Sequence, residues 1–115
     1  MNTEQLRAFC PSLPHVTEDI KWGADLCFSI GGKMFCVTGV DGPLQVSMKV
    51  TDSEFDELTA TAGISPAPYV ARYKWILVEK AGRFTMEEWK HHIKQSYELV
   101  KGTLPKKILK GLDGG

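Results

Sequence analysis

The chain has 115 residues, of which 43% are hydrophobic and 24% are charged. This length and composition predict one globular domain over residues 1–115 and exclude a disordered chain. No apolar run approaches the ~20 residues of a membrane-spanning helix, and the first residues lack the basic and apolar regions of a signal peptide. We therefore expect a cytoplasmic protein without a membrane partner.

Charge is distributed unevenly along the chain, although the formal net charge is zero. Residues 1–60 contain nine acidic and four basic residues (net −5), whereas residues 61–115 contain five acidic and ten basic residues (net +5). A zero total disfavours a protein that coats nucleic acid non-specifically. A basic face contributed by the C-terminal half stays compatible with nucleic-acid binding.

The three cysteines, Cys10, Cys27 and Cys36, form no CxxC pair and are odd in number. This spacing disfavours both a structural zinc site and a disulfide scaffold. We expect reduced thiols that pack as small apolar groups.

A β-hairpin is the clearest predicted element. It follows a short helix that begins near Thr3, and its strands are Leu26–Ile30 and Lys33–Thr38. The loop between them, Gly31-Gly32, is typical of a primed two-residue turn, which needs positive φ at both positions.

The two-residue loop predicts the register of this hairpin. It pairs Phe28 with Phe35, and it places Cys27 opposite Cys36 with Cα atoms ~4.5 Å apart. Two reduced thiols in contact are the simpler interpretation, and a cross-strand disulfide is the alternative. One face of the hairpin then carries the larger apolar side chains: Leu26, Phe28, Ile30, Phe35 and Val37.

The remaining segments predict further strands and helices. Residues 44–50 alternate as a half-buried strand, and a helix follows from the capping box of Thr51 to a stop at Gly63. Residues 65–68 are expected as a loop and 75–79 as a central strand. A long helix runs from Thr85 to Gly102, and a short one begins near Pro105.

This order of elements indicates the fold class. It reads α-β-β-β-α-β-α-α, with a further short strand near residues 20–22, or roughly α-β(3-4)-α-β-α-α. Runs of strands followed by helices are typical of an α+β fold. We therefore expect two layers, in which helices pack on an antiparallel β-sheet.

The sequence contains no recognisable catalytic or metal-binding motif. His91 and His92 are adjacent, so on a helix they would point in different directions and are not expected to share a metal. There is no GxSxG, P-loop or GxGxxG pattern. The acidic residues around Glu54 have a sufficient structural reason in the helix dipole. We expect a non-enzymatic protein without catalytic residues, metal ligands, cofactor or small-molecule substrate.

Several segments together resemble the MmcQ/YjbR family. They are Lys21-Trp22-Gly23 leading into residues 26–35, residues 66–69 with Lys74-Trp75, and residues 96–100 with Leu104-Pro105-Lys106-Lys107. The resemblance covers nearly the whole chain in the expected order. It implies a two-layer α+β fold similar to type III secretion chaperones and to the frataxin-like CyaY arrangement.

The resemblance also implies DNA binding through a double wing, in which hairpins approach the nucleic acid. On this chain the wing would be the hairpin with Gly31, Gly32 and Lys33 at its tip. The alternative is a protein-interaction or chaperone-like module that self-associates. The residues expected to contact DNA are Lys21, Trp22, Lys33, Arg72, Lys74, Lys106 and Lys107. For Lys33, Arg72 and Lys74, simple surface solvation is at least an equal explanation.

Overall fold

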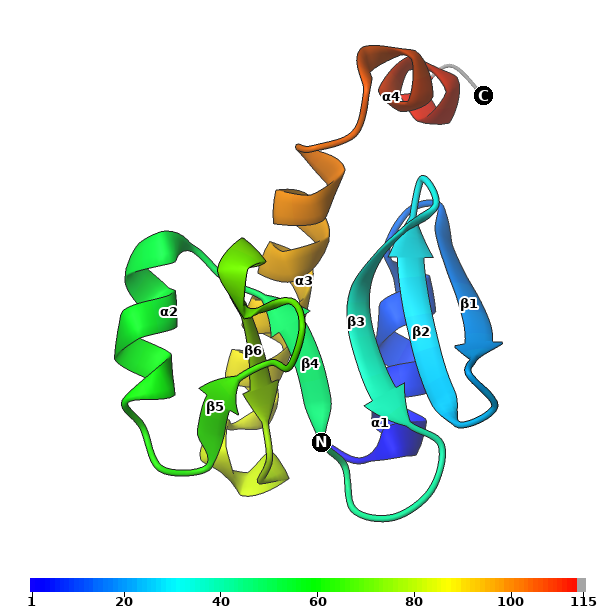
Figure 1. The fold of residues 1–115 in the computed structure, drawn as a ribbon. Coiled ribbons are helices and arrows are strands. Elements are labelled where there is room, and N and C mark those ends of the chain that lie inside the picture. The colour runs from blue at the N-terminus through cyan, green and yellow to red at the C-terminus, as the bar shows by residue number, and fades with distance from the viewer. Residues whose placement is uncertain (114–115) are drawn as a thin grey trace.

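Residues 1–113, which the computed structural model describes, contain a six-stranded antiparallel sheet of order β1-β2-β3-β4-β6-β5 (Figure 1). The strands are β1 (Val16–Lys21), β2 (Asp25–Ile30), β3 (Lys33–Gly39), β4 (Val46–Lys49), β5 (Ile64–Pro66) and β6 (Trp75–Val78). The helices are α1 (Thr3–Phe9), α2 (Asp52–Thr59), α3 (Met86–Lys101) and α4 (Lys106–Asp113), with a 3-10 turn η2 at Ala71–Tyr73.

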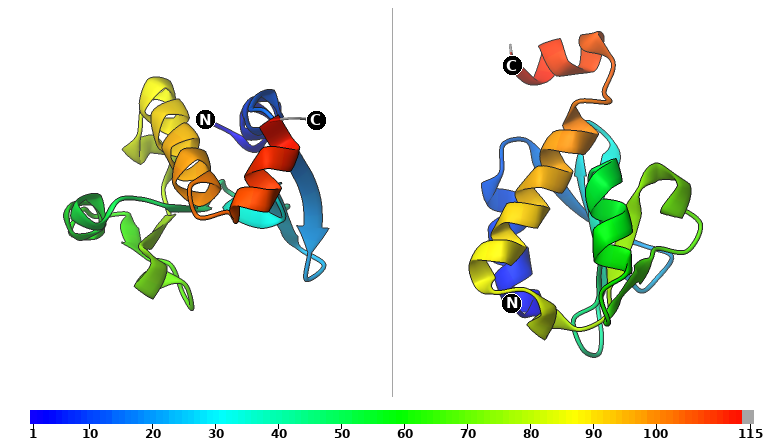
Figure 2. Two further views of the ribbon diagram at one scale, coloured as in Figure 1. Left: turned by 90° about the horizontal axis from the view of Figure 1, so that it is seen from above. Right: turned by 90° about the vertical axis from the view of Figure 1, so that its left-hand side faces the viewer.

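The expected α+β fold with helices packed on an antiparallel sheet is confirmed. Helices α1 and α3 lie on the same side of the sheet, as the view from above shows (Figure 2). Strand β6 is central, between β4 and β5. No helix within residues 1–113 is long and apolar enough to cross a membrane.

Two strands differ from the sequence prediction. Strand β1 is a six-residue edge strand, longer than the short one expected near residues 20–22. Strand β5 covers Ile64–Pro66, where residues 65–68 had been predicted as a loop. Pro66 is tolerated because β5 is the other edge of the sheet, where one missing backbone donor breaks no ladder.

Helix α3 packs on the sheet, and two of its side chains bond to segments outside the helix. Its start has the predicted capping box of Thr85 and Glu88. The buried Trp89 donates its indole N–H to the carbonyl of Ala81 at 2.8 Å. The hydroxyl of Tyr97 donates to the carbonyl of Pro14 at 2.7 Å. These bonds satisfy the polar ends of two large side chains that fill the core.

The hairpin turn has the predicted geometry, with φ of 58° at Gly31 and 85° at Gly32. Its register is as predicted only near the turn. Beyond Ser29 a β-bulge leaves Phe35 without a partner, so that Phe28 faces Cys36.

The predicted Cys27–Cys36 pair is therefore wrong, because the extra residue in β3 shifts Cys27 opposite Val37. All three cysteines are free and buried. Cys36 joins the core and contacts Cys10 instead; a hydrogen bond with Cys10, together with burial, raises the pKa of the Cys36 thiol well above its usual value. Val37 turns to the opposite face of the sheet.

The tip of the hairpin is covered by the C-terminal segment. A Cβ atom built on Gly31 would lie 2.6 Å from Cδ1 of Leu104 and 3.0 Å from Cγ2 of Ile108. Around Gly32, by contrast, no described atom lies within 4 Å of the equivalent position. Gly31 thus serves both the turn and the packing against α4.

Substituting the two turn glycines separates these requirements. We expect Gly32→Ala to cost about 1 kcal/mol of unfolding free energy, because alanine is strained at positive φ. Gly31→Ala should cost about 1–3 kcal/mol more, since the added methyl group overlaps Leu104. Urea unfolding of both variants measures the difference, and equal losses would contradict the packing of the tip against Leu104.

Candidate functional site

The sheet face opposite α1 and α3 carries a groove of about 520 Å³, here called the apolar groove. Strands β2, β3, β4 and β6 form its floor. Trp22 lies at one end beside Asp25, and the loop after β5 forms a wall. Its main apolar lining residues are Trp22, Met34, Val37, Ala67, Tyr69 and Trp75.

The segment that follows β5 gives the groove its wall. It crosses the face of the sheet that the helices leave open (Figures 1 and 2). The N–H of Ala67 donates to the carbonyl of Trp75 at 3.0 Å, which anchors the segment to β6. Tyr69 is 99% exposed, and Trp22, across the groove, is 72% exposed. Large aromatic side chains this exposed are typical of surfaces that bind a partner.

Backbone strain accompanies these aromatic residues. Trp22 has φ of 54° and Tyr69 has φ of 69°, and Lys74, directly before Trp75, has φ of 65°. The left-handed region costs a non-glycine residue roughly 1–2 kcal/mol. Such strain gathers where the position of a side chain is held for function.

A second depression, of about 360 Å³, adjoins the apolar groove and is here called the basic hollow. Lys33, Lys49 and Tyr73 line it, and Val100 and Thr103, at and just beyond the C-terminal end of α3, complete it, so the hollow lies where the open face meets the end of that helix. Met34 and Trp75 line both depressions, so the two form one continuous surface.

Lys49 is held at this surface by the buried Ser96 of α3. The backbone N–H of Lys49 donates to the Ser96 hydroxyl at 2.9 Å, and this hydroxyl donates to the carbonyl of Phe35 at 2.6 Å. The carbonyl belongs to the bulge residue, so Ser96 satisfies polar groups where β3 and β4 are not paired directly.

The cations of this surface have neutral partners. Nζ of Lys33 lies 3.5 Å from Oγ1 of Thr103, and Nζ of Lys49 donates to the carbonyl of Tyr73. Arg72 bonds the Tyr73 hydroxyl at 2.6 Å, with its guanidinium 4.7 Å from the centre of that ring. No carboxylate therefore neutralises these cations among the described residues.

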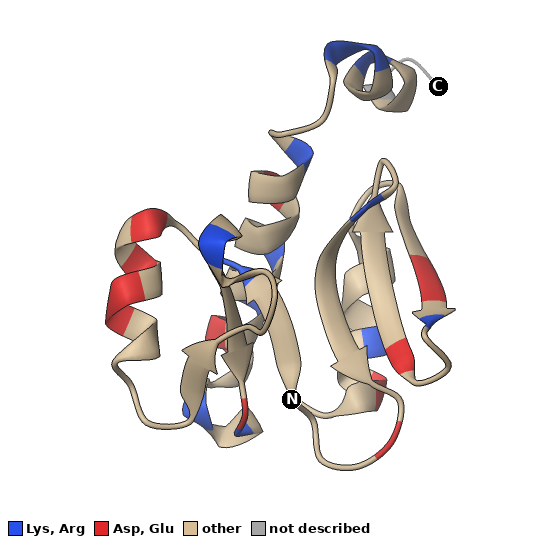
Figure 3. Ribbon diagram, viewed as in Figure 1, with Lys and Arg blue, Asp and Glu red and all other residues tan. Residues whose placement is uncertain are grey.

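Ion pairs are also scarce in the rest of the described chain. Among residues 1–112, whose side chains the structure describes, Arg7–Glu18, at 3.0 Å, is the only ion pair. Acidic residues lie on α2 and on β1, whereas the start of α4 carries basic residues, and further basic residues are spread over the rest of the chain (Figure 3).

The structure brings together some of the residues expected to contact DNA. Trp22 lines the apolar groove and Lys33 the basic hollow, which Arg72 adjoins through Tyr73. The others lie elsewhere: Lys74 is over the ring of Phe55 at 5.0 Å, Lys21 is at the far end of the sheet beside Trp22, and Lys106 and Lys107 are exposed at the start of α4.

Lys49, Tyr69, Tyr73 and Trp75 line this surface but were not among the residues expected to contact DNA. Lys49 occupies a polar position of the alternating strand 44–50, which marks it as facing away from the core. Tyr69 lies in a proline-flanked loop, and nothing in its local sequence indicates that this loop crosses the sheet.

A family model described as YjbR matches residues 11–99. The chain belongs to the YjbR family. The crystal structure of Deinococcus radiodurans protein DR2400, with the family domain DUF419, is similar at 26% identity and a TM-score of 0.86, over 97% of this chain and 88% of that one. A protein from Pseudomonas syringae shares the fold at 21% identity and a TM-score of 0.70, over 86% of this chain and 98% of that one. No curated protein matches.

Two substitutions of Trp22 test whether the left-handed backbone conformation at this position lowers the stability of this YjbR-family protein. Trp22→Gly relieves the left-handed strain, whereas Trp22→Ala loses the same side chain and keeps the strain. We expect the glycine variant to be more stable than the alanine variant by about 1 kcal/mol in urea unfolding. An alanine variant at least as stable as the glycine variant would contradict the strained geometry.

Proposed function

We propose that this YjbR-family protein binds DNA as a single strand on the open face of its sheet. Bases stack on the aromatic residues of the apolar groove, and phosphates contact the lysines of the basic hollow. The observation that carries the proposal is the continuity of the two depressions through Met34 and Trp75, with Lys33 and Lys49 free of carboxylate partners in the part of the chain that is described.

The chemistry of the face suits an unpaired strand. Stacking of a base on an aromatic side chain contributes roughly 1–3 kcal/mol and depends little on sequence. Trp22, Tyr69 and Trp75 offer such rings along one groove. Lysines that contact phosphates supply affinity and set the position of the strand.

The hairpin tip favours this mode over a wing that enters a duplex. Gly31 packs against Leu104 and Ile108, so the tip is not free to enter a DNA groove. Lys33, next to the tip, lines the basic hollow instead. These contacts support a strand that lies across the sheet.

We further propose that the protein binds its ligand without chemical change, in the cytoplasm. Among the described residues that line the two depressions there is no histidine or cysteine. Cys27, which lies on β2 but does not line the groove, has a pKa that burial raises, and this disfavours its nucleophilic thiolate. The lining therefore offers no thiol or serine nucleophile with an imidazole base.

A second candidate function is protein binding, including self-association. The observation that favours it is the exposure of Trp22 and Tyr69 beside an apolar floor, a surface that a hydrophobic peptide or a second copy also fits. Binding of this kind depends little on salt, whereas phosphate contacts weaken steeply as salt rises.

Removing the two lysine charges of the basic hollow tests the proposed function. The double variant Lys33→Met, Lys49→Met keeps most of the side-chain volume and removes two phosphate contacts. We expect weaker binding of a labelled single-stranded oligonucleotide in fluorescence anisotropy. The slope of log K against log salt should fall by about 0.7 per contact, or about 1.4 in total.

Lys94→Met is the matched control, because Lys94 is exposed on α3, on the other side of the sheet. It should leave the affinity and the salt slope unchanged. Absence of binding at low salt, or an equal loss in the control variant, would overturn the proposal. Binding of a hydrophobic peptide with no salt dependence would support the second candidate instead.

A further inference from the structure

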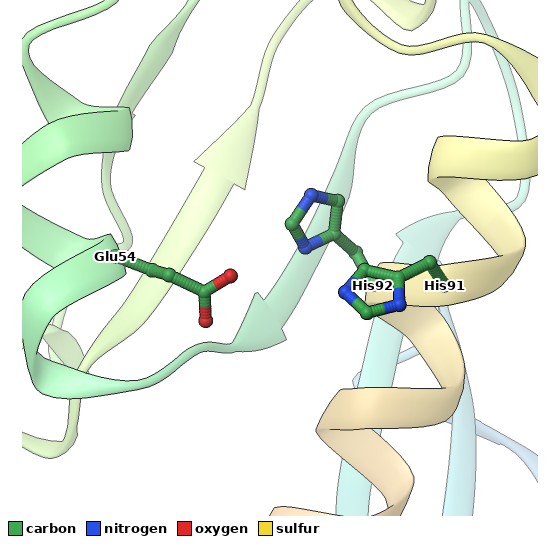
Figure 4. A group of neighbouring side chains, drawn as sticks. All are labelled: Glu54, His91 and His92. Atoms are coloured by element: carbon green, nitrogen blue, oxygen red, sulfur yellow. The ribbon is translucent and has the colours of Figure 1, made fainter.

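Helices α2 and α3 bring three metal-binding side chains together on the helix-covered side of the sheet. Glu54 comes from α2, and His91 and His92 come from α3. One ligand atom from each lies within 4.8 Å of the others. The three side chains converge on the space between the two helices (Figure 4).

The sequence-based expectation that the two adjacent histidines cannot share a metal does not fit this geometry. Their ring centroids are 5.1 Å apart, at an angle of 69°. The directions of His91 and His92 do diverge along α3, but the carboxylate of Glu54 enters the sector between them from a second helix (Figure 4). A pattern confined to one helix cannot reveal such a site.

His92 supplies a second, independent observation. Its side chain is only 9% exposed, and its ring stacks on Phe84 at 4.6 Å, which fixes its plane. Nδ1 of this ring is buried and makes no hydrogen bond of ordinary geometry among the described residues, although the Gln95 side chain lies close enough to act on the ring. In Figure 4 a nitrogen of the His92 ring faces the carboxylate of Glu54. Buried polar atoms are normally paired, so this nitrogen points to a ligand.

Gln95 adds a fourth polar group to the same space, since its side chain hydrogen-bonds to Glu54 and acts on the ring of His92. It lies one turn after His91 on α3, and its Oε1 is also buried and without a partner in the described part of the chain. An amide oxygen is a weaker ligand than imidazole but completes a set of two nitrogens and two oxygens.

The carboxylate of Glu54 is oriented by the start of its own helix. Oε1 of Glu54 accepts from the hydroxyl of Thr51 at 2.7 Å and from its backbone N–H at 3.3 Å. The Gln95 side chain also hydrogen-bonds to this carboxylate. Burial alone would raise the pKa of Glu54, but these bonds hold it below its usual value.

We propose that Glu54, His91 and His92 bind a divalent transition-metal ion, with Gln95 or water as the remaining ligand. Imidazole nitrogens with a carboxylate oxygen suit zinc, cobalt or nickel. Zinc bonds of about 2.0–2.1 Å place tetrahedral ligands roughly 3.4 Å apart, so the ligand atoms approach by up to about 1.4 Å. The exposed His91 is free to make this movement.

Titration of the metal-free protein with Zn²⁺ and with Co²⁺ tests the site. We expect one equivalent to bind in calorimetry. The Co²⁺ complex should have the visible spectrum of nitrogen and oxygen ligands without a thiolate charge-transfer band. That spectrum distinguishes the cluster from the three cysteines.

His91→Ala and Glu54→Gln should each weaken binding by at least about tenfold, since second-shell losses alone cost that much. Glutamine also fits a capping box, so Glu54→Gln preserves the start of α2. His15→Ala, which removes the histidine outside the cluster, is the matched control and should bind as the unaltered protein does. Equal affinity in His91→Ala, an equal loss in His15→Ala, or no binding of either metal would overturn the proposal.

Discussion

The hydroxyl of Ser96 joins β3 to β4 where their direct pairing ends, next to the bulge at Phe35. It donates to the carbonyl of Phe35 at 2.6 Å and accepts the N–H of Lys49 at 2.9 Å. Since Ser96 is fully buried, these polar groups would otherwise lose water without a partner. The bonds fix β3, β4 and α3 relative to one another.

The open face depends on this interruption. The bulge at Phe35 turns Cys36 into the core and Val37 into the floor of the apolar groove. The same junction holds the backbone of Lys49, so that its side chain reaches the carbonyl of Tyr73 in the basic hollow. A regular ladder would have reversed the faces of Cys36 and Val37, because side chains alternate along a strand.

Local sequence patterns predicted correctly those elements whose structure depends only on residues close together in the chain. The Gly31-Gly32 turn and the capping boxes at Thr51 and Thr85 formed as predicted, because each is closed by bonds over three or four residues. The family resemblance and the α+β fold were also confirmed. The bulge at Phe35 could not be predicted, since its partner, Ser96, is 61 residues away.

The candidate site was predictable only in part for the same reason. Trp22 and Lys33 stood out by residue type, but the groove that links them consists of strands and of a loop that crosses the sheet. Lys49 and Tyr69 belong to the candidate site only because this loop crosses the sheet beside them. Likewise, the space between Glu54 and the two histidines exists only because α2 packs near α3.

The most direct test of the open face as the binding surface uses the three tryptophan indole N–H signals in NMR spectra. Trp22 and Trp75 line the apolar groove, whereas Trp89 is buried and bonds to Ala81. On titration with a single-stranded oligonucleotide, the signals of Trp22 and Trp75 should shift and that of Trp89 should stay in place. Shifts confined to the hairpin tip and α4, with Trp22 and Trp75 unmoved, would contradict this account.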